Sequence, residues 1–211
     1  MTETLTFYTN PMSRGRIVRW MLEEVGEPYE TVLLDFGAGT KAPDYLAINP
    51  MGKVPAIRHG EVVVTEAAAI CAYLADMFPD KGLAPPSGNP RRGPYYRWLF
   101  FAAGPLEAAV TAKALGLLAP ADKAPMVGYG SLETVLDTLE KAVSHGPYLC
   151  GEAQFSAADV YLSSQIGWGM MFGTIEPRAA FEDYVGQLQA RPAAVRAREI
   201  DDALMPKKEG A

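Results

Sequence analysis

The chain has 211 residues, with 19 Lys and Arg against 25 Asp and Glu, so its formal net charge is −6. Apolar residues make up 49% and charged residues 21%, a composition typical of a folded globular protein. The acidic balance argues against a nucleic-acid-binding protein, which needs a basic surface, and no apolar stretch is long enough to cross a bilayer. The length fits one large domain or two small ones.

The cysteines and histidines further limit the kinds of site that the protein can have. Cys71 and Cys150 lie too far apart for a CxxC redox pair or a cysteine metal cluster. His59 and His145 stand alone, so no metal site is expected. Because the N-terminal sequence has no basic region followed by an apolar core, no secretory signal is predicted, and we expect a cytoplasmic protein.

The first part of the chain alternates strand-like and helix-like patterns. Strands are indicated by alternating apolar residues and helices by apolar residues at helical spacing. The predicted elements are a strand at 4–8, a helix at 17–25, a strand at 29–34, a short helix at 41–48, strands at 54–58 and 62–64, and a helix at 65–78. A helical crossover between the first two strands predicts a mixed sheet with helices packed on it.

The sharpest change in composition is a stretch rich in proline and glycine that begins at Pro79. We expect a linker there, because such stretches are typical of domain boundaries. Almost everything beyond it is predicted to be helical, at 95–118 with a kink at Gly104-Pro105, and at 132–143, 156–168, 181–190 and 192–200. The predicted domains are an α/β domain over 1–78, a linker over 79–89 and an all-helical domain over 90–211.

Two features of the first domain suggest recognition of a peptide. Val54-Pro55 precedes a strand, and a cis bond there would turn the Val54 backbone toward an extended peptide ligand. A trans proline at a sheet edge is the alternative. Thr65-Glu66 suits the start of a helix, where the free N–H groups can bind a carboxylate while Glu66 binds an ammonium group. A simple helix cap explains the same residues.

Two further features supply a hydroxyl and positive charge. Ser13 lies just before the first predicted helix. It can be a simple helix cap. Alternatively, its hydroxyl lies in the positive potential of the helix start, where a bound thiol ionises more easily to a thiolate. Lys41 and Lys53 are candidates for a second carboxylate, although surface lysines are usually just solvated. A γ-glutamyl tripeptide with a thiol and a carboxylate at each end satisfies all four features.

With these residues the chain resembles the cytosolic glutathione S-transferases over nearly its full length, and looks closest to the bacterial, Ser-type branches. The resemblance implies a thioredoxin-like N-terminal domain, an all-α C-terminal domain and glutathione as cosubstrate. The matching segments are FYTNPMSRGR (7–16), KAPDYL (41–46), NPMGKVPAI (49–57), VTEAAAICAYLADMFP (64–79) and PYLCGEAQFSAADVYL (147–162).

The resemblance also assigns roles to individual residues. Ser13 matches the hydroxyl that hydrogen-bonds the thiolate, while Tyr8 and Asn10 are rivals for that contact. The glutathione-binding positions it implies are Lys41 and Lys53 at the glycine carboxylate, Val54 at the backbone of the cysteine, Pro55 as the cis-proline, and Glu66 and Ala67 at the γ-glutamyl group.

Two departures from the family pattern bear on activity. Ala67 stands where the family usually has serine, so we expect weaker glutathione binding. The head of the first helix carries no cysteine, which argues against disulfide reductase chemistry.

The second substrate is expected between the domains, with Trp168 and Phe101 as candidate lining residues. The resemblance implies a homodimeric transferase that conjugates glutathione to small apolar electrophiles. A glutathione-dependent peroxidase, lyase or isomerase and a noncatalytic binding module are the alternatives.

Overall fold

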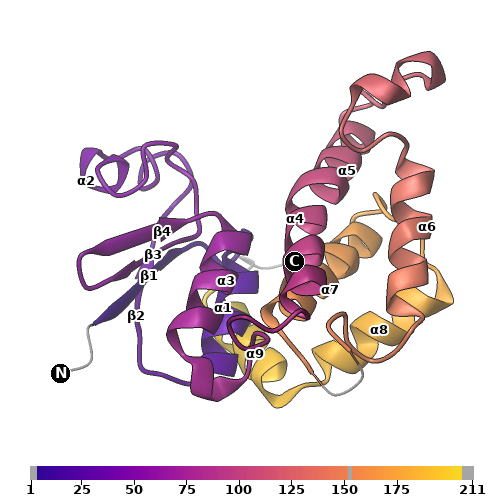
Figure 1. The fold of residues 1–211 in the computed structure, drawn as a ribbon. Helices are drawn as coiled ribbons and strands as arrows, with labels where there is room; N and C mark the ends of the chain where they lie inside the picture. The colour runs from indigo at the N-terminus through magenta and orange to yellow at the C-terminus, as the bar shows by residue number, and fades with distance from the viewer. Residues whose placement is uncertain (1–3, 152–153, 206–211) are drawn as a thin grey trace. The chain divides into compact units, whose positions relative to one another are not determined.

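The computed structural model describes residues 4–151 and 154–205. The chain divides into two compact units (Figure 1). The first holds the described residues up to Met77 together with those from Arg191 onward, and the second holds Phe78–Ala190.

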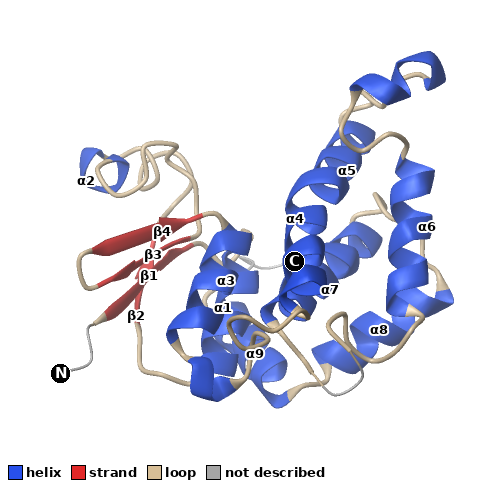
Figure 2. Ribbon diagram, viewed as in Figure 1, coloured by secondary structure: helices blue, strands red, loops and turns tan. Residues whose placement is uncertain are grey.

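The first unit is built on a mixed sheet with the strand order β2-β1-β3-β4 (Figure 2). β1 pairs in parallel with β2 and antiparallel with β3, and β3 pairs antiparallel with β4. The strands are β1 (Leu5–Thr9), β2 (Glu30–Leu33), β3 (Ala56–His59) and β4 (Val62–Thr65). Helix α1 (Gly15–Val25) makes the crossover that the parallel pair requires. The predicted mixed sheet is confirmed.

Alternation along β1 sends successive side chains to opposite faces of the sheet. Phe7 lies under the guanidinium of Arg19, which projects from α1, at 5.0 Å from the ring centroid. Tyr8 packs on the other face with Ala56 and with Tyr45 of the one-turn helix α2 (Pro43–Leu46). Helix α1 also packs against α3 (Ala67–Met77).

Helix α9 (Pro192–Ala203) belongs to the first unit, because it packs against α1. Its buried face is made of small side chains, Ala193, Ala194 and Ala197, which allow two helices to approach closely. The domain boundaries predicted from the sequence include α9 in the helical domain over 90–211, whereas in the structure α9 is part of the first unit. The expected linker at 79–89 stays a prediction.

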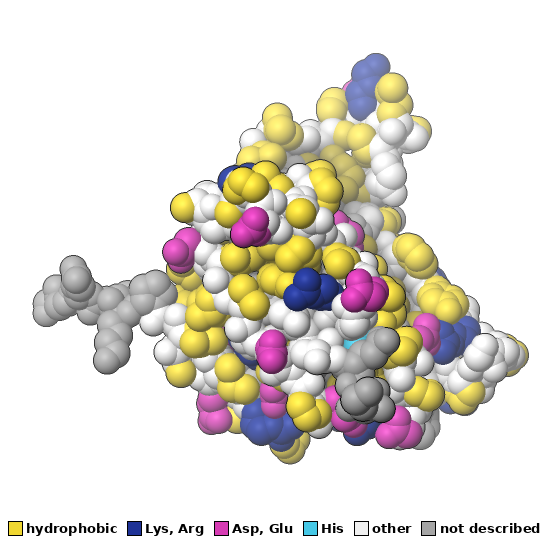
Figure 3. Space-filling model, turned by 90° about the vertical axis from the view of Figure 1, so that its left-hand side faces the viewer, with side chains coloured by type: hydrophobic (Ala, Val, Ile, Leu, Met, Phe, Trp, Pro, Cys, Tyr) yellow, Lys and Arg dark blue, Asp and Glu magenta, His cyan; other side chains and the backbone are white. Residues whose placement is uncertain are grey.

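The first unit exposes several large apolar side chains, among them Phe36 and Met51, which are 56% and 66% exposed. Figure 3 shows apolar side chains over much of the visible face, among charged side chains of both signs. Exposed apolar area of this kind is typical of surfaces that contact a partner.

The second unit is all-helical in its described residues, which confirms the predicted class of this region. A π-helical segment, Ala102–Leu106, interrupts the helix predicted at 95–118. Pro105 lies in it and has no N–H to continue the regular bonding. The regular helices are α4 (Arg92–Phe101), α5 (Glu107–Ala114), α6 (Leu132–Val143), α7 (Ala157–Met171) and α8 (Ala179–Gln189). None of the helices in the described part of the chain is long and apolar enough to span a membrane.

The start of α7 is fixed by a buried acidic group. Asp159 Oδ2 accepts hydrogen bonds from the backbone N–H of Ser156 at 2.9 Å and from its hydroxyl at 2.8 Å. Asp159 Oδ1 accepts from the Leu149 N–H at 2.8 Å and from the Tyr184 hydroxyl at 2.9 Å. Burial raises the pKa of Asp159, and these donors oppose the shift. The arrangement is the capping box that Ser156 and Asp159 form at N-cap and N3.

Replacing Ser156 with alanine is expected to lower the free energy of unfolding by about 1–2 kcal/mol, because a buried cap loses its hydroxyl. Urea unfolding followed by circular dichroism measures the change. Ser131→Ala is the matched control, since Ser131 caps α6 by accepting from the Thr134 N–H at 3.1 Å near the surface. An equal or smaller loss for Ser156→Ala than for Ser131→Ala would contradict the structural role given to Ser156.

Candidate functional site

Ser13 lies in the short segment that connects β1 to α1. Its hydroxyl donates a hydrogen bond to the Asn10 carbonyl at 2.7 Å and accepts one from the Gly15 N–H at 2.9 Å. The side chain is half-buried. Because a backbone N–H at the start of α1 donates to the hydroxyl oxygen, the O–H group is polarised and becomes a better donor.

Gly15 is a functional part of this segment that the sequence patterns did not predict. A Cβ atom at this position would lie 1.9 Å from Thr9 Oγ1 and 3.0 Å from Ser13 Oγ, so a larger residue would force these two side chains to shift. Glycine therefore lets α1 begin close behind the strand and brings its first N–H within reach of Ser13. The glycine in SRGR was the signal in the sequence.

Tyr8 and Asn10, the alternatives to Ser13 for the contact to the glutathione sulfur, both make contacts within the fold. Tyr8 is buried, and its ring centroid lies 5.7 Å from that of Tyr45. Asn10 donates from Nδ2 to the Leu34 carbonyl at 2.9 Å, and its Oδ1 accepts from the Met12 N–H at 2.9 Å. Both polar ends of the Asn10 side chain are thus engaged in holding the segment that carries Ser13.

The Val54–Pro55 peptide bond is cis, as the family resemblance implies. The Lys53 carbonyl just before it accepts from the Tyr45 hydroxyl at 2.5 Å and from Asn49 Nδ2 at 2.8 Å. Burial is the main cause that raises the pKa of Tyr45 to about 12, so its hydroxyl stays a donor. These bonds fix the backbone that enters β3.

Glu66 adopts a left-handed backbone conformation, with φ at +68°. It directly precedes α3, and its carbonyl accepts the Ile70 N–H at 2.9 Å, so Glu66 and not Thr65 takes the N-cap position. A non-glycine residue in this region costs about 1–3 kcal/mol and is found most often at functional sites. The Glu66 side chain is exposed beside Ala67, the first residue of α3, which is buried.

Lys41 and Lys53 lie on either side of one turn. Lys41 Nζ donates to the Met51 carbonyl at 3.0 Å, two residues before Lys53. Gly52 has a φ of +56°, and a Cβ atom there would lie 2.6 Å from Lys41 Nζ. Both lysine side chains are exposed, which leaves their charges accessible to an anion.

Trp168 and Phe101 both belong to the second unit, on α7 and at the end of α4. Both are half-buried, and the Phe101 ring packs edge-on against Trp98 with centroids 5.5 Å apart. Helices α4 and α7 pack against each other. A role of Trp168 and Phe101 in binding a second substrate stays a prediction.

The two cysteines are buried and form no disulfide. Burial raises the pKa of Cys71 and raises that of Cys150 to about 11. The loop that carries Cys150 turns its thiol toward Ser156 Oγ at 3.5 Å. A thiol with a raised pKa is a poor nucleophile, so thiol chemistry at these cysteines is disfavoured.

Comparison with known proteins gives a consistent result. Residues 3–76 match the family model for the glutathione S-transferase N-terminal domain. Glutathione S-transferase GstA of Escherichia coli O157:H7 is 31% identical over 190 residues, which cover 87% of this chain and 89% of that protein. The probable glutathione S-transferase GSTF2 of Oryza sativa subsp. japonica is 53% identical over 55 residues, only 26% of each chain.

A solved structure extends the similarity to three dimensions. The glutathione S-transferase of a sphingomonad, complexed with glutathione, is 31% identical, with a TM-score of 0.74 over 93% of this chain and 98% of that one. The fold is therefore a thioredoxin-like α/β unit followed by a helical region. This chain belongs to the glutathione S-transferase family.

Proposed function

We propose that the protein is a glutathione transferase that binds glutathione, holds its sulfur as a thiolate and delivers it to small apolar electrophiles. The observation that carries the proposal is the Ser13 hydroxyl, which receives the Gly15 N–H at the start of α1. A donor placed in positive potential is what stabilises a thiolate.

In the proposed reaction, the main task of this chain is to orient and stabilise the glutathione thiolate through Ser13. When glutathione binds, the Ser13 hydroxyl turns its proton from the Asn10 carbonyl to the sulfur, while Gly15 N–H continues to donate to its oxygen. The thiol releases its proton to solvent, and the thiolate electron pair forms the new carbon–sulfur bond as the leaving group departs with its own pair. Ser13 lowers the pKa of the thiol and orients the sulfur, but forms no bond to the substrate.

Recognition of glutathione is assigned to the surrounding backbone and charges. Val54, before the cis-proline Pro55, pairs with the cysteine backbone of the ligand like an added strand. Glu66, with its left-handed backbone, presents its side-chain carboxylate to the γ-glutamyl ammonium group of glutathione. The first N–H groups of α3, next to Glu66, suit the carboxylate of the same γ-glutamyl group. Lys41 and Lys53 suit the glycine carboxylate. The sphingomonad relative was solved with glutathione bound, which supports glutathione as the ligand.

The second substrate and the assembly are further parts of the proposal. Trp168 and Phe101 are proposed to contact a small apolar electrophile, since pockets for such ligands are lined mainly by aromatic and aliphatic side chains. A homodimer is proposed as well, and the exposed apolar side chains of the first unit, such as Phe36 and Met51, support it.

Retention on immobilised glutathione, followed by turnover of an aryl halide, tests the proposal. Retention with turnover supports a transferase. Retention without turnover of any aryl halide favours a peroxidase, lyase or isomerase, and no retention at millimolar glutathione favours a noncatalytic module. The absence of a serine hydroxyl at Ala67 is the observation in favour of the last alternative.

Replacing Ala67 with serine is expected to lower the KM for glutathione about tenfold to a hundredfold. The new hydroxyl would donate to a charged ligand carboxylate, a bond worth about 1.5–3 kcal/mol. Steady-state kinetics with varied glutathione measures the change. Ala69→Ser, on the exposed side of the same helical turn, is the control and should leave KM unchanged. An unchanged KM for Ala67→Ser would rule out this account of the γ-glutamyl contact.

A further inference from the structure

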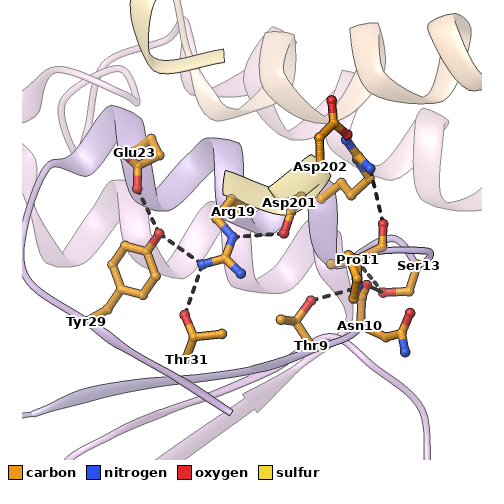
Figure 4. A network of polar contacts seen from close by, with 12 residues as sticks. Thr9, Asn10, Pro11, Ser13, Arg19, Glu23, Tyr29, Thr31, Asp201 and Asp202 are labelled. Carbon is orange, nitrogen blue, oxygen red and sulfur yellow. Dashed lines mark hydrogen bonds and ion pairs between the residues drawn. The ribbon is translucent and has the colours of Figure 1, made fainter. Parts of the chain in front are cut away.

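The end of α9 is fixed on α1 by a buried ion pair. Arg19 Nε donates to Asp201 Oδ1 at 3.0 Å, and each side chain is no more than 2% exposed. Arg19 Nη1 also donates to the Thr31 hydroxyl at 2.9 Å and to that of Tyr29 at 3.2 Å. Figure 4 shows Asp201 and the neighbouring Asp202 beside the segment that carries Thr9, Pro11 and Ser13. The register of α9 on α1 is thereby set.

Asp202 makes a second contact from α9, and this one leads to Ser13. Asp202 pairs with Arg16 Nη2, and Arg16 Nη1 donates to the Pro11 carbonyl at 3.3 Å. Pro11 has no N–H, so its carbonyl is the only backbone hydrogen-bonding group that it offers. Arg16 thus joins α9 to the segment from Asn10 to Ser13.

The segment is held from two sides. Asn10 is bonded to the Leu34 carbonyl, at the end of β2. Pro11, its neighbour, is bonded to Arg16, and Arg16 is held by Asp202. Ser13 then takes its position from the carbonyl of Asn10.

We propose that Asp202 is a positioning residue for glutathione activation: by holding Arg16 on the Pro11 carbonyl, it fixes the segment that presents the Ser13 hydroxyl. The inference rests on the proposed function. Asp202 touches neither glutathione nor the electrophile, and acts through Arg16. A displacement of Ser13 by a fraction of an ångström weakens a hydrogen bond to sulfur, because catalytic contacts depend steeply on geometry.

The sign of the pKa change separates positioning from a simple charge effect. If Asp202 acted only through its negative charge, its removal would make the site more positive and lower the pKa of the bound thiol. If it positions Ser13, its removal loosens the donor and raises that pKa. Asp202 is 58% and Arg16 25% exposed, so the effect should be modest.

The test compares Asp202→Asn with the wild type in two measurements. The pH dependence of kcat/KM for glutathione should shift upward, with kcat/KM about two- to fivefold lower at neutral pH. Hydrogen exchange of the ligand-free protein should be faster in the peptide covering residues 10–16. Asp202→Glu should restore both, and Asp183→Asn, which removes an exposed carboxylate from α8, should change neither.

Two results would overturn the inference: a downward shift of the pH profile in Asp202→Asn, or exchange in residues 10–16 equal to that of the wild type. Exchange is measured without glutathione, so it decides the positioning claim even if the wild type fails to bind glutathione. Failure of the proposed function appears in the wild type, whereas failure of this inference appears only in the comparison with Asp202→Asn.

Discussion

Replacing Ser13 with alanine lowers kcat/KM for glutathione about tenfold to a hundredfold and raises the pKa of the bound thiol by about 1–2 units. Both changes follow from the loss of one hydrogen bond to a charged sulfur, worth about 1.5–3 kcal/mol. The Gly15 N–H that now donates to Ser13 Oγ loses this acceptor. Rates with an aryl halide over a range of pH measure both effects.

Tyr8→Phe is the control for this result. Tyr8 is 6% exposed and packs with Tyr45 and Ala56, so removal of its hydroxyl should leave kcat/KM within about twofold. A large loss for Tyr8→Phe with a small one for Ser13→Ala would transfer the catalytic role to Tyr8.

Replacing Asp201 with alanine is expected to lower the free energy of unfolding by about 3–5 kcal/mol, because Arg19 then remains as a buried charge without its carboxylate. Arg19 lies over the Phe7 ring at the centre of the first unit, so it cannot reach water without displacing the core. Urea unfolding measures the loss.

Two variants control this experiment. Asp202→Ala, one residue further along α9, removes an exposed carboxylate and should cost at most about 1 kcal/mol. The double variant Arg19→Met with Asp201→Leu should recover most of the stability, because apolar side chains of similar size replace both charges. Equal losses for Asp201→Ala and Asp202→Ala would contradict the buried pair.

Local patterns predicted much of the first unit. Alternation of the apolar Leu5 and Phe7 with threonines predicted the first strand, and helical spacing predicted α1. In each case the information lies within a few residues of the chain, where propensity and periodicity apply.

Features that depend on distant residues were not predicted. The place of α9 depends on Arg19 and Asp201, which are 182 positions apart. The left-handed backbone of Glu66 has no local sign, since glutamate does not favour it and the surrounding structure imposes it. The burial of Cys150 likewise depends on where the loop folds back onto Ser156.

In the candidate site, too, the residue types were predicted from the sequence but the contacts between distant residues were not. Residue types at Ser13, Lys41, Lys53 and Glu66 suggested an anionic peptide with a thiol, and the family resemblance assigned the roles. The contacts that hold Ser13 in place, through Gly15 on one side and Arg16 on the other, appear only in three dimensions.

Titration of the thiol of bound glutathione in the wild-type protein tests the central claim most directly. Ultraviolet absorbance of the thiolate, recorded against pH with saturating glutathione, gives its apparent pKa. We expect an apparent pKa at least about one unit below the roughly 8.5 of an ordinary cysteine thiol. A titration curve that matches free glutathione would contradict thiolate stabilisation at Ser13.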